Sequence, residues 1–263
     1  MQTLQHLLVD VARLGVWLAL LCAVFIPLER LFAVRPARWW RVETPTHIGY
    51  YFLSSLLPAA LIAPPMALLA TALHHAMPAA WPTWAAALPA PARWTLALVL
   101  AEVGMYWGHR WSHAWPLLWR FHATHHAPEH LDWLCNTRAH PVDMVFVRLC
   151  GLVPVYASGL LQVQDGHAQS IAFALATTVW GFLIHANLRW RFGVLEHLVT
   201  TPAFHHWHHT RHGPIDRNYA TMFPWIDRLF GTLHLPREWP AAYGIDSPTP
   251  PSMWRQLVAP FRR

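Results

Sequence analysis

The sequence predicts an all-α integral membrane protein with four or five transmembrane helices and a cytoplasmic helical cap. Hydrophobic residues make up 55% of the 263-residue chain and charged residues only 12%, a balance that suits lipid better than water. Residues 44–92 contain no Asp, Glu, Lys or Arg, and a buried helix of a soluble protein rarely needs such a length. Many of the 20 histidines fall in two short stretches that follow apolar segments, which predicts a polar cap beside the membrane.

Five hydrophobic segments, each near the length of about 20 residues that a bilayer crossing requires, predict the helices in order. They cover residues 11–32, 48–77, 94–111, 142–161 and 168–188. The first is rather short in its most apolar part, but it lacks the basic start and the small-residue cleavage site of a signal peptide, so we expect a retained span. Pro64 and Pro65 interrupt the second, which predicts either one kinked span or a re-entrant hairpin.

The charge pattern predicts the orientation. All basic residues except His are Arg, and the formal net charge is +6. Arginines flank the apolar segments around residues 30–41 and 189–191, as the positive-inside rule expects of cytoplasmic loops. A nucleic-acid-binding face would be continuous, so this class is excluded. The N-terminus and the loops near Trp84 and Asp165 are then outside, and every histidine motif is cytoplasmic. We expect the bacterial inner membrane, with the endoplasmic reticulum left open.

The histidines follow the spacing of metal ligands. His109 and His113 are four residues apart, and the pattern His-x2-His-His occurs twice, at His122, His125 and His126 and again at His205, His208 and His209. On a helix these spacings place imidazoles on one face, where they can converge on a metal. Cys22, Cys135 and Cys150 share no paired spacing, so we expect neither a disulfide nor an iron-sulfur site.

Eight such imidazoles exceed the needs of one metal, because a closed zinc site uses four ligands. The inventory therefore predicts two metals in one pocket, with almost no carboxylate ligands, unlike soluble di-iron bundles. Oxygen activation fits this set better than hydrolysis. The chain contains no His-Glu-x-x-His motif, no Gly-x-Ser-x-Gly elbow and no phosphate-binding loop.

At these residues the sequence resembles the fatty acid hydroxylase and sterol desaturase superfamily of membrane-bound di-iron oxygenases. Residues 106–113 (YWGHRWSH), 121–129 (FHATHHAPE) and 201–209 (TPAFHHWHH) resemble its three histidine boxes. Residues 183–187 (LIHAN) resemble the isolated histidine before the last box, and residues 218–219 (NY) and 225–232 (WIDRLFGT) resemble its closing segment. Ala220, Thr221 and Glu102 depart from the family pattern.

The resemblance implies two iron ions and O2 as co-substrate, and hydroxylation or desaturation of a fatty acyl chain, a sterol or a related apolar lipid. The metal ligands that it implies are His109, His113, His122, His125, His126, His185, His205, His208 and His209. The domains expected on this basis are an N-terminal membrane-spanning region (1–92), a catalytic domain (93–235) and a Pro-rich, irregular tail (236–263).

The chain carries no dinucleotide-binding motif and no cytochrome b5 signature, so a separate donor, such as ferredoxin or cytochrome b5 with its reductase, is expected to supply electrons. Arg211, Arg217 and Arg228 predict a docking face for such an acidic protein, contacts to lipid phosphates, or completion of the positive-inside charge pattern. His47 is expected to be a hydrogen-bonded core or interfacial residue. His140 either completes a metal shell or caps the next helix, and it stays outside the ligand set. The alternative function is a divalent-metal transporter or another metal-binding membrane protein that uses the same histidines.

Overall fold

The computed structural model describes residues 2–77, 83–160 and 167–262, and this part of the chain is helical without strands. The long helices are α1 (Gln2–Phe32), α2 (Thr44–Ala76), α4 (Ala90–Ala114), α6 (Pro141–Ala157) and α7 (His167–His185). The shorter helices are α3 (Thr83–Ala86), α5 (Pro116–His126), α8 (Pro202–His208), α9 (Pro224–Leu229) and α10 (Met253–Val258), with 3-10 turns η1 (Trp133–Thr137), η3 (Gly193–His197) and η4 (Ala259–Phe261).

The five predicted hydrophobic segments all form helices. Within the described residues, α1 and α2 are long and apolar enough to cross a membrane. That α4, α6 and α7 also cross it remains a prediction, and the predicted end of the fourth segment, at Leu161, lies outside the described residues, as does Asp165. Helix α2 continues through Pro64 and Pro65, so the re-entrant hairpin is wrong and the segment is one helix.

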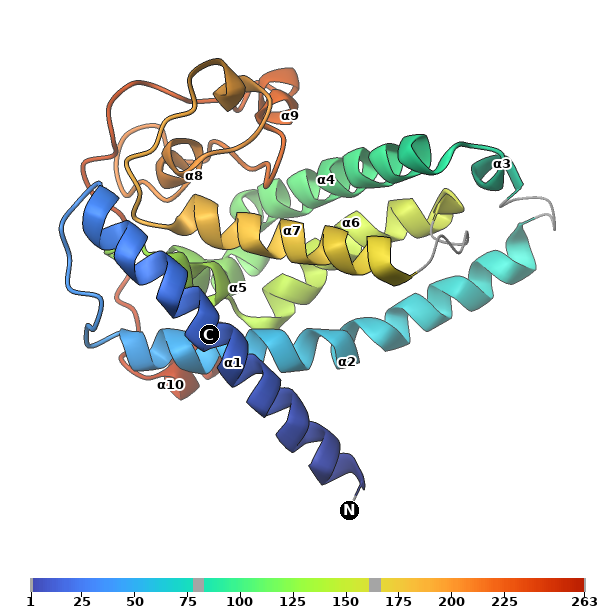
Figure 1. Cartoon of the computed structure of the whole chain (residues 1–263), viewed down its shortest axis with the longest axis horizontal. Helices are drawn as coiled ribbons and strands as arrows, with labels where there is room; N and C mark the ends of the chain where they lie inside the picture. Colours follow the sequence, from blue (N-terminus) through green and yellow to red (C-terminus); the bar gives the residue numbers. More distant parts are fainter. Residues whose placement is uncertain (1, 78–82, 161–166, 263) are drawn as a thin grey trace.

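Helices α2, α4, α6 and α7 run roughly side by side, with α3 at one end of the bundle and α8 at the other (Figure 1). Helices α4 and α6 pack backbone against backbone. A Cβ added to Gly104 would lie 2.1 Å from the carbonyl oxygen of Cys150, and one added to Gly108 would lie 2.8 Å from the Cys150 Cβ. Only glycine allows this approach, and it fixes the direction in which α4 presents its last turn.

The histidine-rich end of the bundle is built from α5, α8 and the last turns of α4 and α7. Its core contains Tyr106, Phe204 and Ile226, each with no exposed surface. The sequence predicts an irregular tail after residue 236, but part of this tail forms the helix α10. The side chain of Met253 covers Gly49 of α2, and the Leu257 carbonyl accepts a hydrogen bond from His140. The tail thus folds back onto the bundle.

Candidate metal centre

The nine histidines that the sequence singles out come from four helix ends. Helix α4 carries His109 and His113 in its last two turns, α5 carries the three histidines of the second box, and α7 ends at His185. Helix α8 carries the third box, and its N-cap residue Thr201 accepts a hydrogen bond from Phe204 N. Capping fixes the start of this short helix, and with it the direction of the imidazoles that follow.

These imidazoles form two groups, in each of which the candidate ligand atoms lie within 4.8 Å of one another. The first group consists of His109, His113, His122, His126 and His208. The second group consists of His125, His185, His205 and His209. The groups adjoin, because the rings of His126 and His209 are stacked with their centroids 4.5 Å apart. All nine predicted residues are therefore brought together, and both groups contain imidazoles only.

Backbone carbonyls fix the tautomer of four of these rings. The Nδ1–H groups of His109 and His208 donate to the carbonyls of Tyr219 and Arg217, each at 2.8 Å. In the second group, His185 donates to Gly181 at 2.8 Å and His125 donates to Arg138 at 3.1 Å. A carbonyl can only accept, so Nδ1 carries the proton and Nε2 keeps its lone pair.

Two carboxylates orient further rings of the first group. The Nδ1 of His122 lies 3.0 Å from Asp143 Oδ2, and the Nδ1 of His113 lies 2.9 Å from Asp216 Oδ1. Asp143 is buried and also accepts from Ser112 Oγ at 3.2 Å. Such carboxylate–imidazole pairs are common behind metal ligands, where they orient the ring and raise its basicity.

The Nε2 atoms point at one another. Those of His125 and His185 are 3.3 Å apart, and those of His185 and His205 are 2.8 Å apart. Because carbonyls hold the protons of His125 and His185 on Nδ1, neither Nε2 can donate to the other, and two lone pairs meet in a dry interior. A cation between them removes this repulsion. With metal–nitrogen bonds of about 2.0–2.1 Å, neighbouring ligand atoms lie about 3 Å apart, so the residues present fit bound metal.

Burial favours the neutral form of five rings, those of His125, His126, His205, His208 and His209. It lowers the pKa of His125 to about 3, with a further contribution from the nearby His122 ring. The pKa values of His126, His205, His208 and His209 are lowered well below the usual value, again chiefly by burial and then by neighbouring imidazoles. Neutral imidazole is the form that binds a metal.

One short segment supplies three of the outer contacts of the first group. Asp216 holds His113 with its side chain, while Arg217 and Tyr219 hold His208 and His109 with their carbonyls. Asp216 and Asn218 both have φ 60°, in the left-handed region, which Asn and Asp tolerate better than most residues. We call residues 216–219 the acceptor segment.

Buried side chains hold the acceptor segment in place. The Asn218 side chain donates to the carbonyls of Phe204 and His234 and accepts from His234 N. Asp227 accepts from the backbone N–H groups of Tyr219 and Ala220, each at 2.8 Å, and from Thr232. The closing motif at residues 225–232 thus acts as a scaffold for the acceptor segment.

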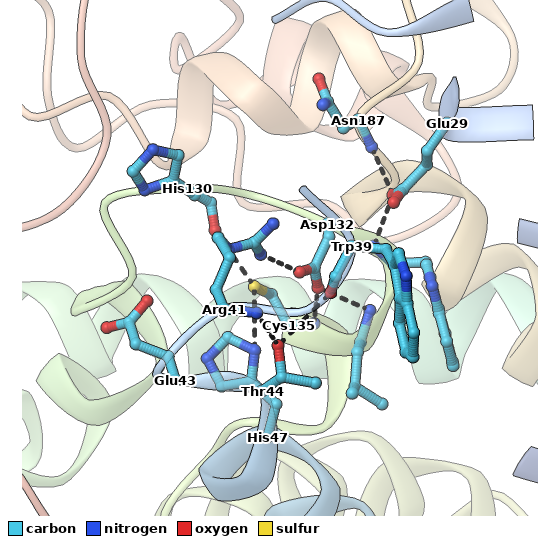
Figure 2. Close-up of polar contacts among 12 residues, drawn as sticks. Glu29, Trp39, Arg41, Glu43, Thr44, His47, His130, Asp132, Cys135 and Asn187 are labelled. Carbon is cyan, nitrogen blue, oxygen red and sulfur yellow. Dashed lines mark hydrogen bonds and ion pairs between the residues drawn. The ribbon is translucent and has the colours of Figure 1, made fainter. Parts of the chain in front are cut away.

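A third cluster, His47, Asp132 and Cys135, also has ligand atoms within 4.8 Å of one another, and Figure 2 shows it beside Arg41. Arg138 Nη1 donates to His47 Nε2 at 3.0 Å, so the proton of this ring is on Nδ1, which closes that atom to a metal. Asp132 pairs with Arg41 and accepts from the N–H groups of Leu134 and Cys135. The cluster is a hydrogen-bonded core, and His47 belongs to it as the sequence predicted.

The structure also places other residues that the sequence left open. His140 is the N-cap of α6, because its Nδ1 accepts from Val142 N at 3.1 Å, and it lies outside both groups. His206 points away from them and bonds Tyr243 and the Ala186 carbonyl. Arg211 is paired with Glu129 and Asp246, which weakens its predicted part in docking. Glu102, a departure from the family pattern, accepts from Met222 N.

An apolar groove of about 550 Å³ lies between α4 and α6. Trp107 and Trp111, which flank His109 in the sequence, line it together with Phe146 and Val153 of α6. An apolar surface therefore reaches the helix that carries the first histidine pair.

The sequence did not reveal the groups that bond the Nδ1 atoms of the imidazoles. Asp143 had a signal, because it is a lone acid at the start of an apolar segment. The carbonyls of Arg138, Arg217 and Tyr219 had none, since every residue has a carbonyl and only the fold selects which one faces an imidazole.

Comparisons with known proteins show which family and relatives the chain is similar to. The family model "Fatty acid hydroxylase" matches residues 94–232. Ornithine lipid hydroxylase OlsE from Rhizobium tropici is 34% identical over 172 residues, which cover 64% of this chain and 50% of the relative. Alkylglycerol monooxygenase from Danio rerio is 30% identical over 156 residues, which cover 59% of this chain and 33% of the relative.

The chain thus spans half or less of the length of these curated relatives. No solved structure matches it. The family model covers more than half of the chain, from the first turns of α4 to the end of the closing motif, and includes all nine clustered histidines. The chain belongs to the fatty acid hydroxylase family.

Proposed function

We propose that this protein is a membrane-bound, O2-dependent lipid hydroxylase with a di-iron centre. The observation that carries the proposal is the pair His125 and His185, whose Nε2 lone pairs face each other at 3.3 Å while carbonyls hold both Nδ1 protons. A cation that shares the two lone pairs stabilises this arrangement. This pair belongs to the second imidazole group, and the clustered ligand atoms of the first group support a second metal.

The first imidazole group would hold one metal and the second group the other, with His109, His113, His122, His126 and His208 on one side and His125, His185, His205 and His209 on the other. Imidazole nitrogen suits iron, zinc, copper and nickel. The family supports iron, which when bound supplies the oxygen activation that no amino-acid side chain provides.

The protein's own residues orient the imidazole ligands and shield the metal centre from water. Carbonyls and carboxylates hold protons on the Nδ1 atoms of six rings, so the Nε2 of each of these six is presented to the metal without a competing hydrogen. The rings of both groups are buried or nearly so, which excludes bulk water from the reaction. Orientation and exclusion of water are the contributions that a protein makes around a reactive cofactor.

The substrate we propose is a membrane lipid, attacked at an unactivated C–H bond. The relatives are named as a hydroxylase and a monooxygenase of lipids, which supports oxygen insertion over desaturation. The groove lined by Trp107 and Trp111 offers an apolar surface next to the histidine-bearing helix. Two candidate membrane helices support a location in the bilayer, and we propose the bacterial inner membrane with the metal centre on the cytoplasmic side.

The reaction needs a reductant. Inserting one atom of O2 into a C–H bond and releasing the other as water consumes two electrons and two protons. We propose that a separate ferredoxin, or cytochrome b5 with its reductase, supplies the electrons. Since Arg211 is neutralised by two acids, docking would depend on other cationic side chains of the cap.

Heavy-isotope O2 tests the function directly. The iron-loaded protein is reconstituted in vesicles of bacterial lipid extract with reduced ferredoxin, and the lipids are analysed by mass spectrometry. We expect a labelled hydroxylated lipid with the wild type and with His74→Ala, an exposed control, and none with His185→Ala. Transport of divalent metal into the vesicles without oxygen consumption would instead support the alternative function, a divalent-metal transporter.

A further inference from the structure

Two short elements of the cap, η3 and α9, carry a group of large apolar side chains at the surface. Val194 is 81% exposed and Leu229 is 69% exposed. We call the whole group the apolar patch, and it consists of Val194, Leu195, Leu198, Trp225 and Leu229. Exposed apolar side chains that gather in this way mark an interaction site far more often than scattered ones do.

The apolar patch is one surface. Helix α9 contacts η3, and Arg228 Nη2 lies 3.1 Å from His197 Nδ1, so a polar contact joins the two elements between the apolar residues. The opposite face of α9 is packed, since Ile226 has no exposed surface and Asp227 is anchored to Tyr219 and Ala220. The outward apolar residues therefore stand on a fixed support.

Around the apolar patch the acidic side chains are buried and a basic side chain is exposed. The acid of η3, Glu196, is buried, accepts from Phe192 N and pairs with Arg191. The acid of α9, Asp227, is buried too. Arg228, in contrast, is exposed between Trp225 and Leu229. The surface thus presents apolar, aromatic and cationic side chains while its acids face inward, which complements an anionic lipid surface.

The position of the patch along α4 supports the same partner. Phe230, at the end of α9, stacks on Tyr106 and packs against Trp107. Asp216, in contrast, contacts His113. These two levels of α4 are six residues apart, which is about 9 Å along a helix axis. The end of α9 therefore lies closer than Asp216 to the apolar middle of α4, and in Figure 1 α9 lies above this helix.

We propose that the apolar patch inserts into the interfacial layer of the lipid bilayer, with Arg228 bound to lipid phosphates, so that the cap is held on the membrane independently of the long helices. Tryptophan and arginine next to leucine and valine are the side chains that populate this layer. Because η3 leads into α8 and its histidines, the contact would also fix the height of the metal centre above the lipid.

Depth-dependent fluorescence quenching tests the proposal without any turnover. Leu229→Cys is labelled with an environment-sensitive fluorophore in a Cys22→Ala, Cys150→Ala background, since the remaining Cys135 is fully buried. The full chain is placed in vesicles of phosphatidylglycerol and phosphatidylcholine. The control is Ile215→Cys, which is 54% exposed and adjoins Asp216 in the acceptor segment.

We expect lipids with a nitroxide near the headgroup to quench most of the Leu229→Cys signal and aqueous iodide to quench little of it, with the reverse for Ile215→Cys. Val194→Cys, a second site that does not depend on the packing of α9, should behave as Leu229→Cys does. Equal quenching of all three labels by iodide would overturn the proposal.

A second copy of the chain is the other partner that this surface fits. If the patch binds a second copy, labels on different chains should show energy transfer that is lost on dilution into excess lipid, and lipid nitroxides should not quench them. This result would overturn the membrane contact. Arg228→Glu should lower the quenching by lipid nitroxides more in phosphatidylglycerol than in phosphatidylcholine alone. An equal effect in both lipids would contradict the role of Arg228.

Discussion

His125 and His185 face each other across 3.3 Å through their Nε2 atoms, although carbonyl oxygens of Arg138 and Gly181 keep both protons on the far side of the rings. Two hydrogen-bond acceptors in contact within a protein interior are costly unless a third group satisfies both. This relationship is the physical basis of the proposed metal centre, and it depends on residues that are 60 positions apart in the sequence.

Replacing one ligand of the second group should remove one metal rather than both. We expect His185→Ala to retain about half of the iron of the wild type, since the five imidazoles of the first group are intact. Metal analysis of the purified protein measures the ratio. His47→Gln is the matched control, because His47 is buried but bonds Arg138 and not a metal; equal loss of iron in both variants would contradict the two-group arrangement.

Asp143 should increase the affinity of the first imidazole group for its metal. Asp143→Asn removes the charge that orients His122, and loss of such a contact typically weakens metal binding about 10–100-fold. Competition with a chelator of known affinity measures the effect. The exposed Asp10→Asn variant should bind metal as the wild type does, and an unchanged affinity in Asp143→Asn would show that His122 needs no partner.

Asn218 should stabilise the folded protein both through its side-chain hydrogen bonds and through its tolerance of a left-handed backbone. Asn218→Gly keeps access to φ 60° but loses three side-chain hydrogen bonds, at a cost of about 1–3 kcal/mol for each buried group left unpaired. Asn218→Ala adds about 1–2 kcal/mol for the left-handed backbone. Thermal unfolding should therefore rank the wild type above Asn218→Gly and Asn218→Ala lowest; the opposite order of the two variants would refute the conformational argument.

The metal-free protein should lose stability in mild acid. Burial lowers the pKa of His125 to about 3 and that of His126 well below its usual value, whereas both titrate near 6.5 in the unfolded chain. As pH falls below about 6.5 the unfolded state takes up protons that the folded state does not, so the free energy of unfolding decreases, by about 1.4 kcal/mol for each pH unit and each such imidazole.

Chemical unfolding of the chelator-treated protein between pH 8 and pH 5 checks this decrease. The full stability should be present above pH 6.5 and should fall continuously below it. A flat profile would mean that the rings are not buried in the metal-free state.

Gly104 should be required for the contact between α4 and α6. Gly104→Ala places a methyl group 2.1 Å from a backbone carbonyl oxygen, and the displacement of α6 that this forces should cost about 1–3 kcal/mol. Gly15→Ala has nothing within 4 Å and should be neutral or stabilising, because alanine favours the helix. Melting temperatures in detergent compare the two, and equal values would contradict the close packing.

The sequence predicts the helices and the histidine-rich helix ends well, because both depend on local pattern. Apolar segments of sufficient length give α1 and α2, and spacing of three or four residues places His122, His125 and His126 on one face of α5. The meeting of His125 with His185 depends on packing between distant helices, so only the resemblance to a family could predict it.

Other features could not be read from the chain. Whether Pro64 and Pro65 end a helix depends on whether neighbouring groups can satisfy the carbonyls that the two prolines leave without a donor, and α2 continues through both. The role of Asp216 depends on its left-handed backbone beside His113, and no residue pattern announces it. The helix α10 in the Pro-rich tail depends on its contact with α2 around Gly49.

A cryo-EM map of the iron-loaded protein in lipid nanodiscs tests the central claim most directly. The two imidazole groups should each enclose one density peak, with the Nε2 atoms of His125 and His185 about 2.1 Å from the same peak. Rings of His125 and His185 that turn away from each other, with no density between them, would contradict the account.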